Sequence, residues 1–445
     1  MLPSLPSIAE AQTLMRRGKL RPIDLVEHCL GRIHQFEDEI HAWVMVDDEG
    51  SKAEARRLGK MLDDGQEPVG PLHGIPIGIK DIIDVAGWPT LCGSKLRAGH
   101  LAEKDAAVVA SLRKAGAIIL GKTVTTEWAS FDPPPTRNPW NLNHTPGGSS
   151  SGSAAAVAME MCLAALGTQT GGSIIRPASY CGVVGLKPNF GWISREGIFP
   201  FSLHLDHVGP IARCIEDAVQ TYACFSRSHL SSESFHLSEA DSLMVRWLEG
   251  GILAEEDTET QRHFAGVRSR LSEYCGNESL AMPEFLAPAR TIHRCIMAVE
   301  GAEVHRVAFE RREEDFGHKI RSLINEGRQP TALDFANSLR RQAEIQIRSH
   351  DTQNWFEGHS RVVWAMPSTP TAAPGVETTG DPVFNSLWSL AGLTTITIPC
   401  GLNEHGLPFG LQLIGTFEDD VAKAAFLCES ALAFSHKPPL LKQKR

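Results

Sequence analysis

The sequence contains no hydrophobic run long enough to cross a membrane. Its best apolar candidate, Ala154–Leu166, is shorter than the roughly 18 residues that a span requires and is interrupted by Glu160. The N-terminal stretch MLPSLPSIAEAQTLMRRGKL also lacks the apolar segment and the small-residue cleavage site of a secretory signal peptide. We therefore expect a cytoplasmic protein without a membrane span.

Clustered positive charge is also missing. The chain carries 43 Lys and Arg residues against 53 Asp and Glu residues, which gives a net charge of −10. Proteins that bind the phosphate backbone of nucleic acids need a concentrated basic surface, and no basic block or arm is present here. No GxGxxG fingerprint follows a predicted strand either. Neither nucleic acid nor a nucleotide cofactor is therefore expected as a partner.

Paired cysteines are missing as well. The ten cysteines show no CxxC pair and no Cys/His spacing of the kind that holds zinc. They stand at positions 29, 92, 162, 181, 214, 224, 275, 295, 400 and 428. We expect reduced, mostly buried thiols, with no disulfide framework and no metal.

The chain does have the composition and patterning of a globular α/β protein. Hydrophobic residues make up 42% and charged residues 22% of its 445 positions. Ser7 and Glu10 form a capping box ahead of an apolar-periodic stretch that Gly18 ends, and Pro22 begins a second helix. Short β-branched runs follow, separated by Ala-rich stretches: GIPIGIKDIID, AGAIILGKT, RVVWAMP and TTITIP. This alternation predicts an α/β fold whose helices cover both faces of a central sheet.

Residues 226–350 differ from the rest of the chain. They are rich in charges at helical spacing and poor in strand signals, as in FERREEDFGHKIRSLINE. No Gly/Pro/Ser linker bounds this segment, so we expect a helical layer of the same domain rather than a separate domain. The Pro/Thr/Gly-rich segment 366–382 is expected to form a loop that lines a site.

A serine-rich stretch, PGGSSSGSAAAVA at 146–158, is the first feature that could carry chemistry. Its alanines open the run AAAVAMEMCLAAL, which predicts a helix over 154–166. A loop at a helix N-terminus presents outward N–H groups and suits an anion or a developing oxyanion. Ser150 formally occupies the centre of a GxSxG nucleophile elbow, but that motif must follow a strand. The preceding TRNPWNLNHTP is a Pro/Asn-rich loop, so the elbow reading is weak.

Two further features could carry chemistry. A double glycine precedes Ser173, and glycines let the backbone turn several N–H groups toward one point, as stabilisation of an oxyanion requires. The alternative is a tight turn before a buried strand. Lys80 is a lone ammonium in an apolar, strand-like run, where burial lowers the pKa of an amine toward that of a usable base. The alternative there is an ion pair with Asp81 or Asp84 at a strand end.

Five ordered motifs resemble those of the amidase signature enzymes, a family of serine amidohydrolases. The motifs are GIPIGIKDI, TRNPWNLNHTPGGSSSGSAAAVA, GTQTGGSIIRPASYCGVVGLKP, DHVGPIAR and GLPFGLQLIG. The resemblance covers about residues 66–225 and 360–430. It implies the amidase signature fold, a mixed central β-sheet covered by helices on both faces, as a single domain over residues 1–445. The expected parts are N-terminal helices (1–65), the signature core (66–225), a variable helical layer (226–350) and the C-terminal part of the core (351–445).

The resemblance also implies a Ser, Ser, Lys triad. Its nucleophile corresponds to Ser173, its bridging serine, in an unusual cis conformation, to Ser149, and its base to Lys80. The implied oxyanion hole consists of the backbone amides of Thr170, Gly171, Gly172 and Ser173. The family chemistry requires no metal and no cofactor.

The implied activity is hydrolysis of a small-molecule amide at its C–N bond through a serine acyl-enzyme. Trp128, Phe131 and Phe199 lie in segments that flank the site, which suggests an apolar or aryl group on the substrate. Core packing is the alternative role for these aromatic side chains. The same tetrahedral chemistry would serve esters or carbamates, and a homodimer is left open.

Three other functions stay open at this point. One is the glutaminase-type component of a heteromeric amidotransferase, which passes ammonia to a partner protein. Another is an inactive scaffold, against which the intact Lys80, Ser149 and Ser173 argue. The third is an esterase that uses Ser150.

The chain departs from the family pattern at three positions. Gln169 stands where most members have aspartate, and the loss of a carboxylate near the triad predicts a lower pKa for Lys80. Arg176 comes one position later than in the usual GGSIR, which leaves its structural role open. His204 stands where serine is common, and we expect a structural histidine there rather than a member of a Ser/His/Asp system.

Overall fold

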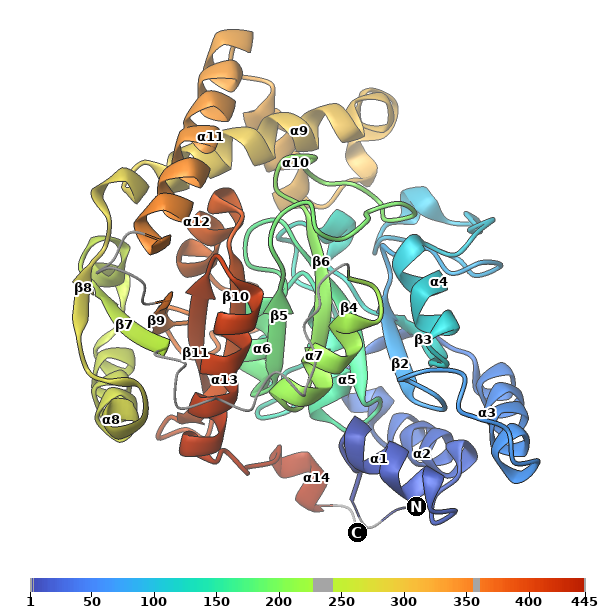
Figure 1. Ribbon diagram of the computed structural model, residues 1–445. Helices are drawn as coiled ribbons and strands as arrows, with labels where there is room; N and C mark the ends of the chain where they lie inside the picture. The colour runs from blue at the N-terminus through green and yellow to red at the C-terminus, as the bar shows by residue number, and fades with distance from the viewer. Residues whose placement is uncertain (1, 3, 227–242, 355–360, 444–445) are drawn as a thin grey trace.

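The computed structural model describes residues 2, 4–226, 243–354 and 361–443, and one mixed sheet of eleven strands runs through this part of the chain (Figure 1). The strand order is β1-β3-β2-β4-β6-β5-β10-β11-β9-β7-β8. The strands are β1 (Trp43–Val46), β2 (Pro76–Lys80), β3 (Ile118–Thr123), β4 (Ala164–Gln169), β5 (Val184–Lys187), β6 (His207–Ala212), β7 (Leu243–Glu249), β8 (Ser279–Ala281), β9 (Arg361–Pro367), β10 (Thr394–Leu402) and β11 (Pro408–Gly415). The predicted α/β class with a mixed central sheet is confirmed.

Three neighbouring strands, β3, β2 and β4, pair in parallel with β2 in the middle. Two of them are the runs PIGIK and IILGKT, whose β-branched residues predicted strands. All their residues are buried, as expected of parallel strands that are covered on both faces. Because parallel strands end at the same edge of a sheet, the last residues of β2 and β4, Lys80 and Gln169, lie at one edge.

Helices cover both faces of the sheet. They are α1 (Ile8–Arg16), α2 (Pro22–Ile40), α3 (Asp48–Asp63), α4 (Ala107–Lys114), α5 (Ser151–Ala158), α6 (Ile175–Cys181), α7 (Ile215–Ala223), α8 (Thr258–Cys275), α9 (Ala289–Arg312), α10 (His318–Gly327), α11 (Ala332–Asn354), α12 (Val383–Ala391), α13 (Glu418–Leu432) and α14 (Pro439–Gln443). In Figure 1, α7 and α13 stand in front of the sheet, whereas α5 and α6 pack behind it. Helices α9, α10 and α11 gather beyond one end of the strands, at the top of the view.

The N-terminal helices begin where the sequence predicts. The Glu10 N–H donates to Ser7 Oγ at 3.2 Å and the Ser7 N–H donates to Glu10 Oε2 at 2.8 Å, which completes the predicted capping box of α1. Gly18 follows α1 with a φ of 66°, a conformation that glycine adopts without strain. Pro22 is the first residue of α2.

The expected helical layer of residues 226–350 contains α8, α9, α10 and most of α11, but also two strands that were not predicted, β7 and β8, which extend the sheet beyond β9. The residues of β7 read LMVRWLE, in which charged side chains interrupt the apolar pattern. Arg246 pairs with Glu278, and Glu249 pairs with Arg268, near the edge of the sheet where such pairs reach solvent. Because of these charged residues, the sequence of β7 lacks the continuous apolar pattern that predicts a strand. Residues 227–242 of this segment lie outside the described residues.

The predicted helix over 154–166 is too long. Helix α5 ends at Ala158, Glu160 has a φ of 56°, and the chain continues as β4 from Ala164. The alanines of β4 favour a helix on propensity alone, but β4 pairs with β2 on one side and with β6 on the other. Tertiary pairing therefore overrides the local preference of this run.

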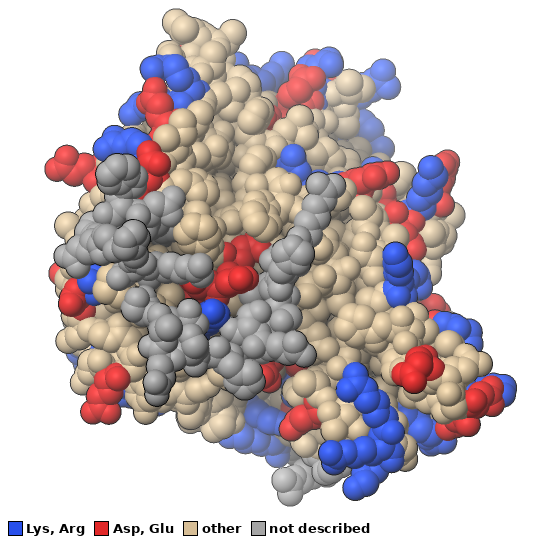
Figure 2. Space-filling model, in the orientation of Figure 1, with Lys and Arg blue, Asp and Glu red and all other residues tan. Residues whose placement is uncertain are grey.

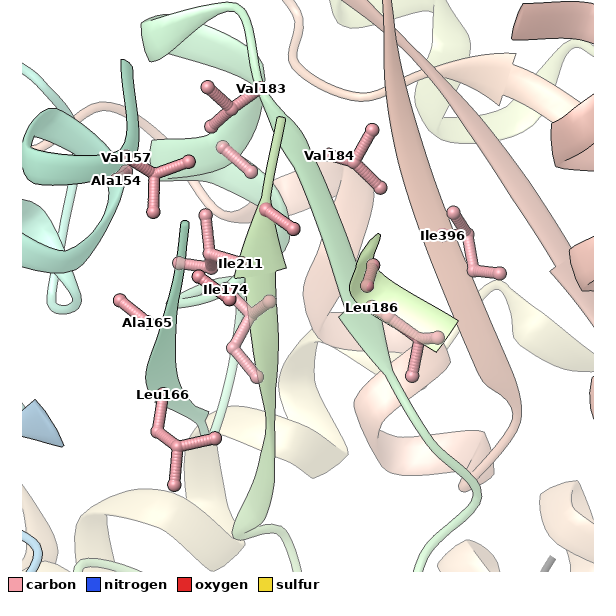
Figure 3. Packing of buried hydrophobic residues seen from close by; sticks show 14 of the residues in the cluster. Ala154, Val157, Ala165, Leu166, Ile174, Val183, Val184, Leu186, Ile211 and Ile396 are labelled. Carbon is pink, nitrogen blue, oxygen red and sulfur yellow. The ribbon is translucent and has the colours of Figure 1, made fainter. Parts of the chain in front are cut away.

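Small side chains bring α5 close to the sheet. Figure 3 shows Ala154 and Val157 of α5 packed with Ala165 of β4 and Ile211 of β6, all of them inaccessible to solvent. The serines at the start of α5 are equally buried. Because a buried hydroxyl is costly unless it is hydrogen-bonded, each of these serines needs a defined partner.

The surface carries no field of a single sign on the face in view, where basic and acidic side chains are interspersed (Figure 2). Within the described ranges, no helix is both long enough and apolar enough to cross a membrane. The same part of the chain contains no cluster of three or more His, Cys, Asp or Glu side chains that could hold a metal ion.

Candidate active site

Lys80 is the last residue of β2, and its side chain is inaccessible to solvent. Its Nζ donates to Ser149 Oγ at 2.7 Å and to Thr168 Oγ1 at 2.8 Å. Burial holds the pKa of this amine well below its ordinary value of 10.5, and the carboxylate of Asp206 opposes that shift. The alternative of an ion pair with a neighbouring aspartate is wrong for Asp81, which pairs with Lys122 at 2.9 Å.

The serine-rich stretch forms the loop that leads into α5, and each of its hydroxyls has a fixed partner. The Gly148–Ser149 peptide bond is cis, as the family resemblance implies. Ser151 Oγ donates to the Gly147 carbonyl at 2.6 Å, and Ser153 Oγ donates to the Leu166 carbonyl at 2.9 Å. These contacts tie the loop to itself and to β4, so the stretch is a rigid part of the site and not a flexible spacer.

The Ser150 hydroxyl is held by backbone groups and does not have the environment of a nucleophile. Its Oγ donates to the Thr168 carbonyl at 3.2 Å and accepts from the Thr168 N–H at 3.3 Å. The side chain is buried, and no strand precedes it in the described residues 124–150. A nucleophile elbow centred on Ser150 is therefore not formed.

Arg176 has a structural contact with the loop that carries Ser149. Its guanidinium is 1% exposed, and Nη2 donates to the Gly148 carbonyl at 2.6 Å and to Thr379 Oγ1 at 3.4 Å. Burial lowers the pKa of Arg176, although the group remains a strong donor. The shifted arginine thus anchors the peptide next to Ser149, a role that the sequence left open.

The segment Thr170–Ser173 forms a turn between β4 and α6. Within the described part of the chain, the N–H groups of Gly171, Gly172 and Ser173 donate to no protein acceptor. Gly172 is required by a close approach, since an added Cβ would lie 2.6 Å from Asn385 Oδ1. The turn therefore presents a row of unpaired donors beside the Ser173 hydroxyl.

Ser149 and Ser173 lie on adjacent segments. The Ser150 N–H donates to the Ser173 carbonyl at 3.3 Å, which joins the two segments directly. No hydrogen bond joins the two hydroxyl groups themselves within the described residues. The structure therefore contains the contact between Lys80 and Ser149, whereas the two serine hydroxyls are not hydrogen-bonded to each other. Catalytic hydrogen bonds often tighten only when substrate binds.

A cavity of about 560 Å³ opens onto the turn. Its lining includes Ser173 and Arg176, the apolar side chains Phe131, Phe201, Met297 and Val383, and the rim arginines Arg290 and Arg294. A smaller cavity of about 280 Å³ shares Ala129, Thr170 and Phe201 with it and continues along Phe199, Asp206 and His207. Asp381 and Pro382, from the predicted site-lining loop, also border the larger cavity.

The three predicted substrate-contacting aromatic residues are placed differently. Phe131 lines the larger cavity and Phe199 the smaller one. Trp128 lines neither, because its ring is 4% exposed and packs against Phe199 at a centroid distance of 4.9 Å and against His305 at 4.8 Å. Trp128 therefore packs in the core, which was the alternative role given above for these aromatic side chains.

The expected effect of Gln169 on the pKa of Lys80 stays a prediction. The Gln169 side chain makes its hydrogen bonds to Ile174, Ile175 and Ser389 and makes none to Lys80 in the described residues. The carboxylate that acts on the pKa of Lys80 is Asp206. Burial is the main cause of the lowered pKa of Lys80.

The two histidines near the site, His204 and His207, make structural contacts. His204 Nδ1 contacts a carboxylate oxygen of Glu300, and its ring is half exposed. His207 is buried with Nδ1 against the Leu205 carbonyl at 2.6 Å, and burial holds its pKa well below its ordinary value. Asp206 accepts from Thr170 Oγ1 at 2.6 Å. Within the described residues none of these three side chains contacts Ser173.

Three site residues were missed in the sequence. Thr168 accepts from Lys80, His293 of α9 contacts the Thr170 carbonyl at 3.0 Å, and Ser389 of α12 donates to the Gly171 carbonyl at 3.1 Å. Thr168 lies in the quoted motif GTQTGG, which offered a signal. His293 and Ser389 lie far from every motif along the chain, so no local pattern identifies them.

One match to a phosphate-binding motif was also overlooked in the sequence. Residues 116–123, GAIILGKT, have the spacing GxxxxGK[ST] of a phosphate-binding loop. The structure places Ile118–Thr123 in β3, and Lys122 is buried in its ion pair with Asp81. A phosphate-binding loop needs free backbone N–H groups at a helix N-terminus, which this buried strand does not provide.

Comparison with known proteins gives concordant matches. A family model described as Amidase matches residues 24–250. The A subunit of the glutamyl-tRNA(Gln) amidotransferase of Synechococcus elongatus is 31% identical over 98% of this chain and 100% of its own length. A crystal structure of an amidase superposes with a TM-score of 0.85 at 30% identity, covering 96% of this chain and 99% of that one. A peptide amidase from Stenotrophomonas maltophilia superposes with a TM-score of 0.80 at 26% identity, covering 98% of both.

Proposed function

The chain belongs to the amidase family of enzymes that act on amide C–N bonds, and we propose on this premise that it is a stand-alone amidohydrolase working through a serine acyl-enzyme. One observation carries the proposal: the buried amine of Lys80 is in hydrogen-bond contact with Ser149, next to a turn whose unpaired N–H groups flank Ser173. In this proposal Ser173 is the nucleophile, Ser149 the proton bridge and Lys80 the base.

The proposed reaction starts with neutral Lys80, which accepts the hydroxyl proton of Ser149 while Ser149 accepts that of Ser173. The Ser173 oxygen bonds to the amide carbon, and the carbonyl electrons move onto oxygen to give a tetrahedral oxyanion. The proton then passes back through Ser149 to the leaving nitrogen, the C–N bond breaks and the amine departs. Water attacks the remaining ester along the same proton path, which releases the carboxylic acid and frees Ser173.

The surroundings of Lys80 support a neutral base. An amine that is inaccessible to solvent loses its hydration when charged, so burial favours its neutral form. The N–H groups of Gly171 and Gly172, with those of Thr170 and Ser173, are the proposed oxyanion hole. Donors that are already in position strengthen as charge develops on the substrate oxygen, which is the main source of acceleration in such sites.

The larger cavity supports a small substrate with an apolar or aryl group. Its volume of about 560 Å³ suits a compact molecule, and Phe131, Phe201 and Met297 provide apolar walls. The guanidinium groups at its rim are already paired, Arg290 with Glu255 at 3.0 Å and Arg294 with Glu326 at 2.5 Å. Neither guanidinium is therefore free to attract an ionised substrate, which favours a neutral substrate group.

The test uses the purified full-length chain with a panel of aryl amides, aliphatic amides, glutamine, esters and carbamates. We expect turnover of small aryl or apolar amides by the wild type, and its loss in Ser173→Ala. No turnover of any amide by the isolated chain, or full turnover by Ser173→Ala, would overturn the proposal.

The second candidate is the glutaminase-type component of a heteromeric amidotransferase. Its support is that the curated relatives from Synechococcus elongatus and Roseiflexus castenholzii, 31% and 32% identical, are A subunits of glutamyl-tRNA(Gln) amidotransferase. Such a protein would prefer glutamine and would depend on a partner protein. Cleavage of aryl amides by the isolated chain at a rate that exceeds its rate with glutamine separates the two functions.

A further inference from the structure

Two side chains outside every recognised motif hydrogen-bond the carbonyl groups of the turn that carries the proposed oxyanion hole. In a trans peptide unit the C=O and the following N–H point in opposite directions. The Thr170 carbonyl and the Gly171 N–H therefore belong to one unit, and the Gly171 carbonyl and the Gly172 N–H to the next. A donor on either carbonyl fixes the direction in which the corresponding N–H points.

His293 holds the first of these peptide units. Its Nε2 lies 3.0 Å from the Thr170 carbonyl oxygen, and the side chain is 3% exposed. A carbonyl only accepts hydrogen bonds, so Nε2 carries the ring proton and donates it. Burial lowers the pKa of His293 to about 4, so the ring is neutral and its tautomer is fixed by this contact at neutral pH.

Ser389 holds the second peptide unit, and Gln169 sets the direction of its hydroxyl. Gln169 Oε1 accepts from the N–H groups of Ile174 at 2.9 Å and Ile175 at 3.0 Å, at the start of α6. Its amide nitrogen therefore faces Ser389 Oγ, to which it donates at 3.1 Å. The Gly171 carbonyl can only accept, so the Ser389 hydroxyl donates its hydrogen to it, at 3.1 Å.

An amide at position 169 is essential to this chain of hydrogen bonds. A carboxylate would also accept from the N–H groups of Ile174 and Ile175, but it has no hydrogen to give to Ser389. The Ser389 hydroxyl would then turn toward the carboxylate and leave the Gly171 carbonyl without its donor. Gln169, which departs from the family pattern, thus provides the donor that keeps the hydroxyl of Ser389 in α12 directed at the Gly171 carbonyl.

We propose that His293 and Ser389, the latter oriented by Gln169, are positioning residues that aim the Gly171 and Gly172 N–H groups at the substrate's carbonyl oxygen. The inference rests on the proposed function and deepens it. Each of the two side chains also polarises the peptide unit that it holds, which makes the N–H on the far side a better donor. Neither side chain touches the reacting atoms in this scheme.

The experiment compares steady-state kinetics of Ser389→Ala, Gln169→Glu, their double variant, His293→Phe and His293→Gln on the best amide found for the wild type. Removal of one oxyanion-hole donor lowers kcat by about 100-fold to 1000-fold, so loosening a donor should cost less, roughly 10-fold to 100-fold. We expect kcat to fall by this amount in Ser389→Ala, in Gln169→Glu with its carboxylate ionised, and in His293→Phe, with KM unchanged within about 2-fold. In His293→Gln an amide N–H can replace Nε2, so most of the wild-type kcat should return.

Two comparisons distinguish positioning from a general structural role. Since Gln169 acts only through Ser389, the double variant should be no slower than Ser389→Ala alone, whereas independent roles would multiply the two losses. His305→Gln serves as the matched control, because His305 is buried on the same helix but packs among aromatic rings and should retain wild-type kcat. Wild-type kcat in Ser389→Ala and His293→Phe, or multiplied losses in the double variant, would overturn the inference. If the wild type itself cleaves no amide, it is the proposed function that fails.

Discussion

Replacing Lys80 with methionine tests whether this amine is neutral in the folded protein. Methionine has a similar length and leaves no group that titrates at the position. Lys80 is buried at the end of β2, and its pKa in the folded chain is well below the ordinary value of 10.5 that it regains on unfolding. The consequence is a pH dependence of stability that only the wild type shows.

The sign and size of this effect follow from proton binding. Between the folded and unfolded pKa values of Lys80, the unfolded chain binds one proton more than the folded chain. The free energy of unfolding therefore rises with pH by about 1.4 kcal/mol per pH unit in that interval. From pH 8 to pH 9.5, the wild type should gain about 2 kcal/mol relative to Lys80→Met. The proposed mechanism adds that wild-type kcat/KM rises with pH through the folded pKa of Lys80 and then levels off.

The assay is urea unfolding of both proteins at several pH values, with the difference in unfolding free energy plotted against pH. Comparing the two proteins removes the contribution of every other group that titrates. Lys104→Met, at an exposed position, is the control and should give a difference that does not vary with pH. If the difference between wild type and Lys80→Met is also flat over this interval, Lys80 is charged in the folded chain and cannot be the base.

Three further predictions concern neighbouring residues. Ser150→Ala should retain at least a third of wild-type kcat in the amide assay, because its hydroxyl bridges backbone groups; loss of all turnover would point to an esterase-like nucleophile at this position. Arg176→Met should lower kcat by roughly 10-fold, since it removes a charge-assisted hydrogen bond worth about 1.5–3 kcal/mol from the loop that carries Ser149, and an unchanged kcat would argue against the anchoring role. Lys122→Met should cost about 3–5 kcal/mol of stability in urea unfolding by leaving the Asp81 carboxylate buried alone, and the double variant with Asp81→Asn should recover part of it; equal losses in both would argue against the pair.

Local sequence patterns predicted the parts of the fold that depend on local interactions. The capping box of Ser7 and Glu10 and the first-turn proline of α2 are confirmed because their partners lie within three residues. The β-branched runs around Ile77 and Ile119 became β2 and β3, because such residues favour a strand whatever its partner strand is. Where tertiary pairing decides the structure, the patterns failed, as in the alanines of β4 and in the charged strand β7, which lies next to the edge strand β8.

Only those residues of the candidate site that lie in recognised motifs could be predicted from the sequence. Lys80, Ser149 and Ser173 were selected from motifs along the chain, and their catalytic roles remain a proposal. His293 and Ser389, which contact the carbonyl groups of the turn, come from α9 and α12, 123 and 218 positions away in sequence from those carbonyl groups. Only the packing of those helices over the edge of the sheet brings them together, and no periodicity or spacing encodes such a contact.

Trapping the acyl-enzyme tests whether Lys80 and Ser149 activate Ser173. The wild type and Lys80→Met would be mixed with an activated aryl ester, quenched in acid, and analysed by intact mass and by peptide mapping. We expect one acyl group on Ser173 of the wild type within seconds, and a rate of acylation at least 100-fold lower in the variant. Acylation of a different residue, or equal rates in the two proteins, would refute the roles proposed for Lys80 and Ser173.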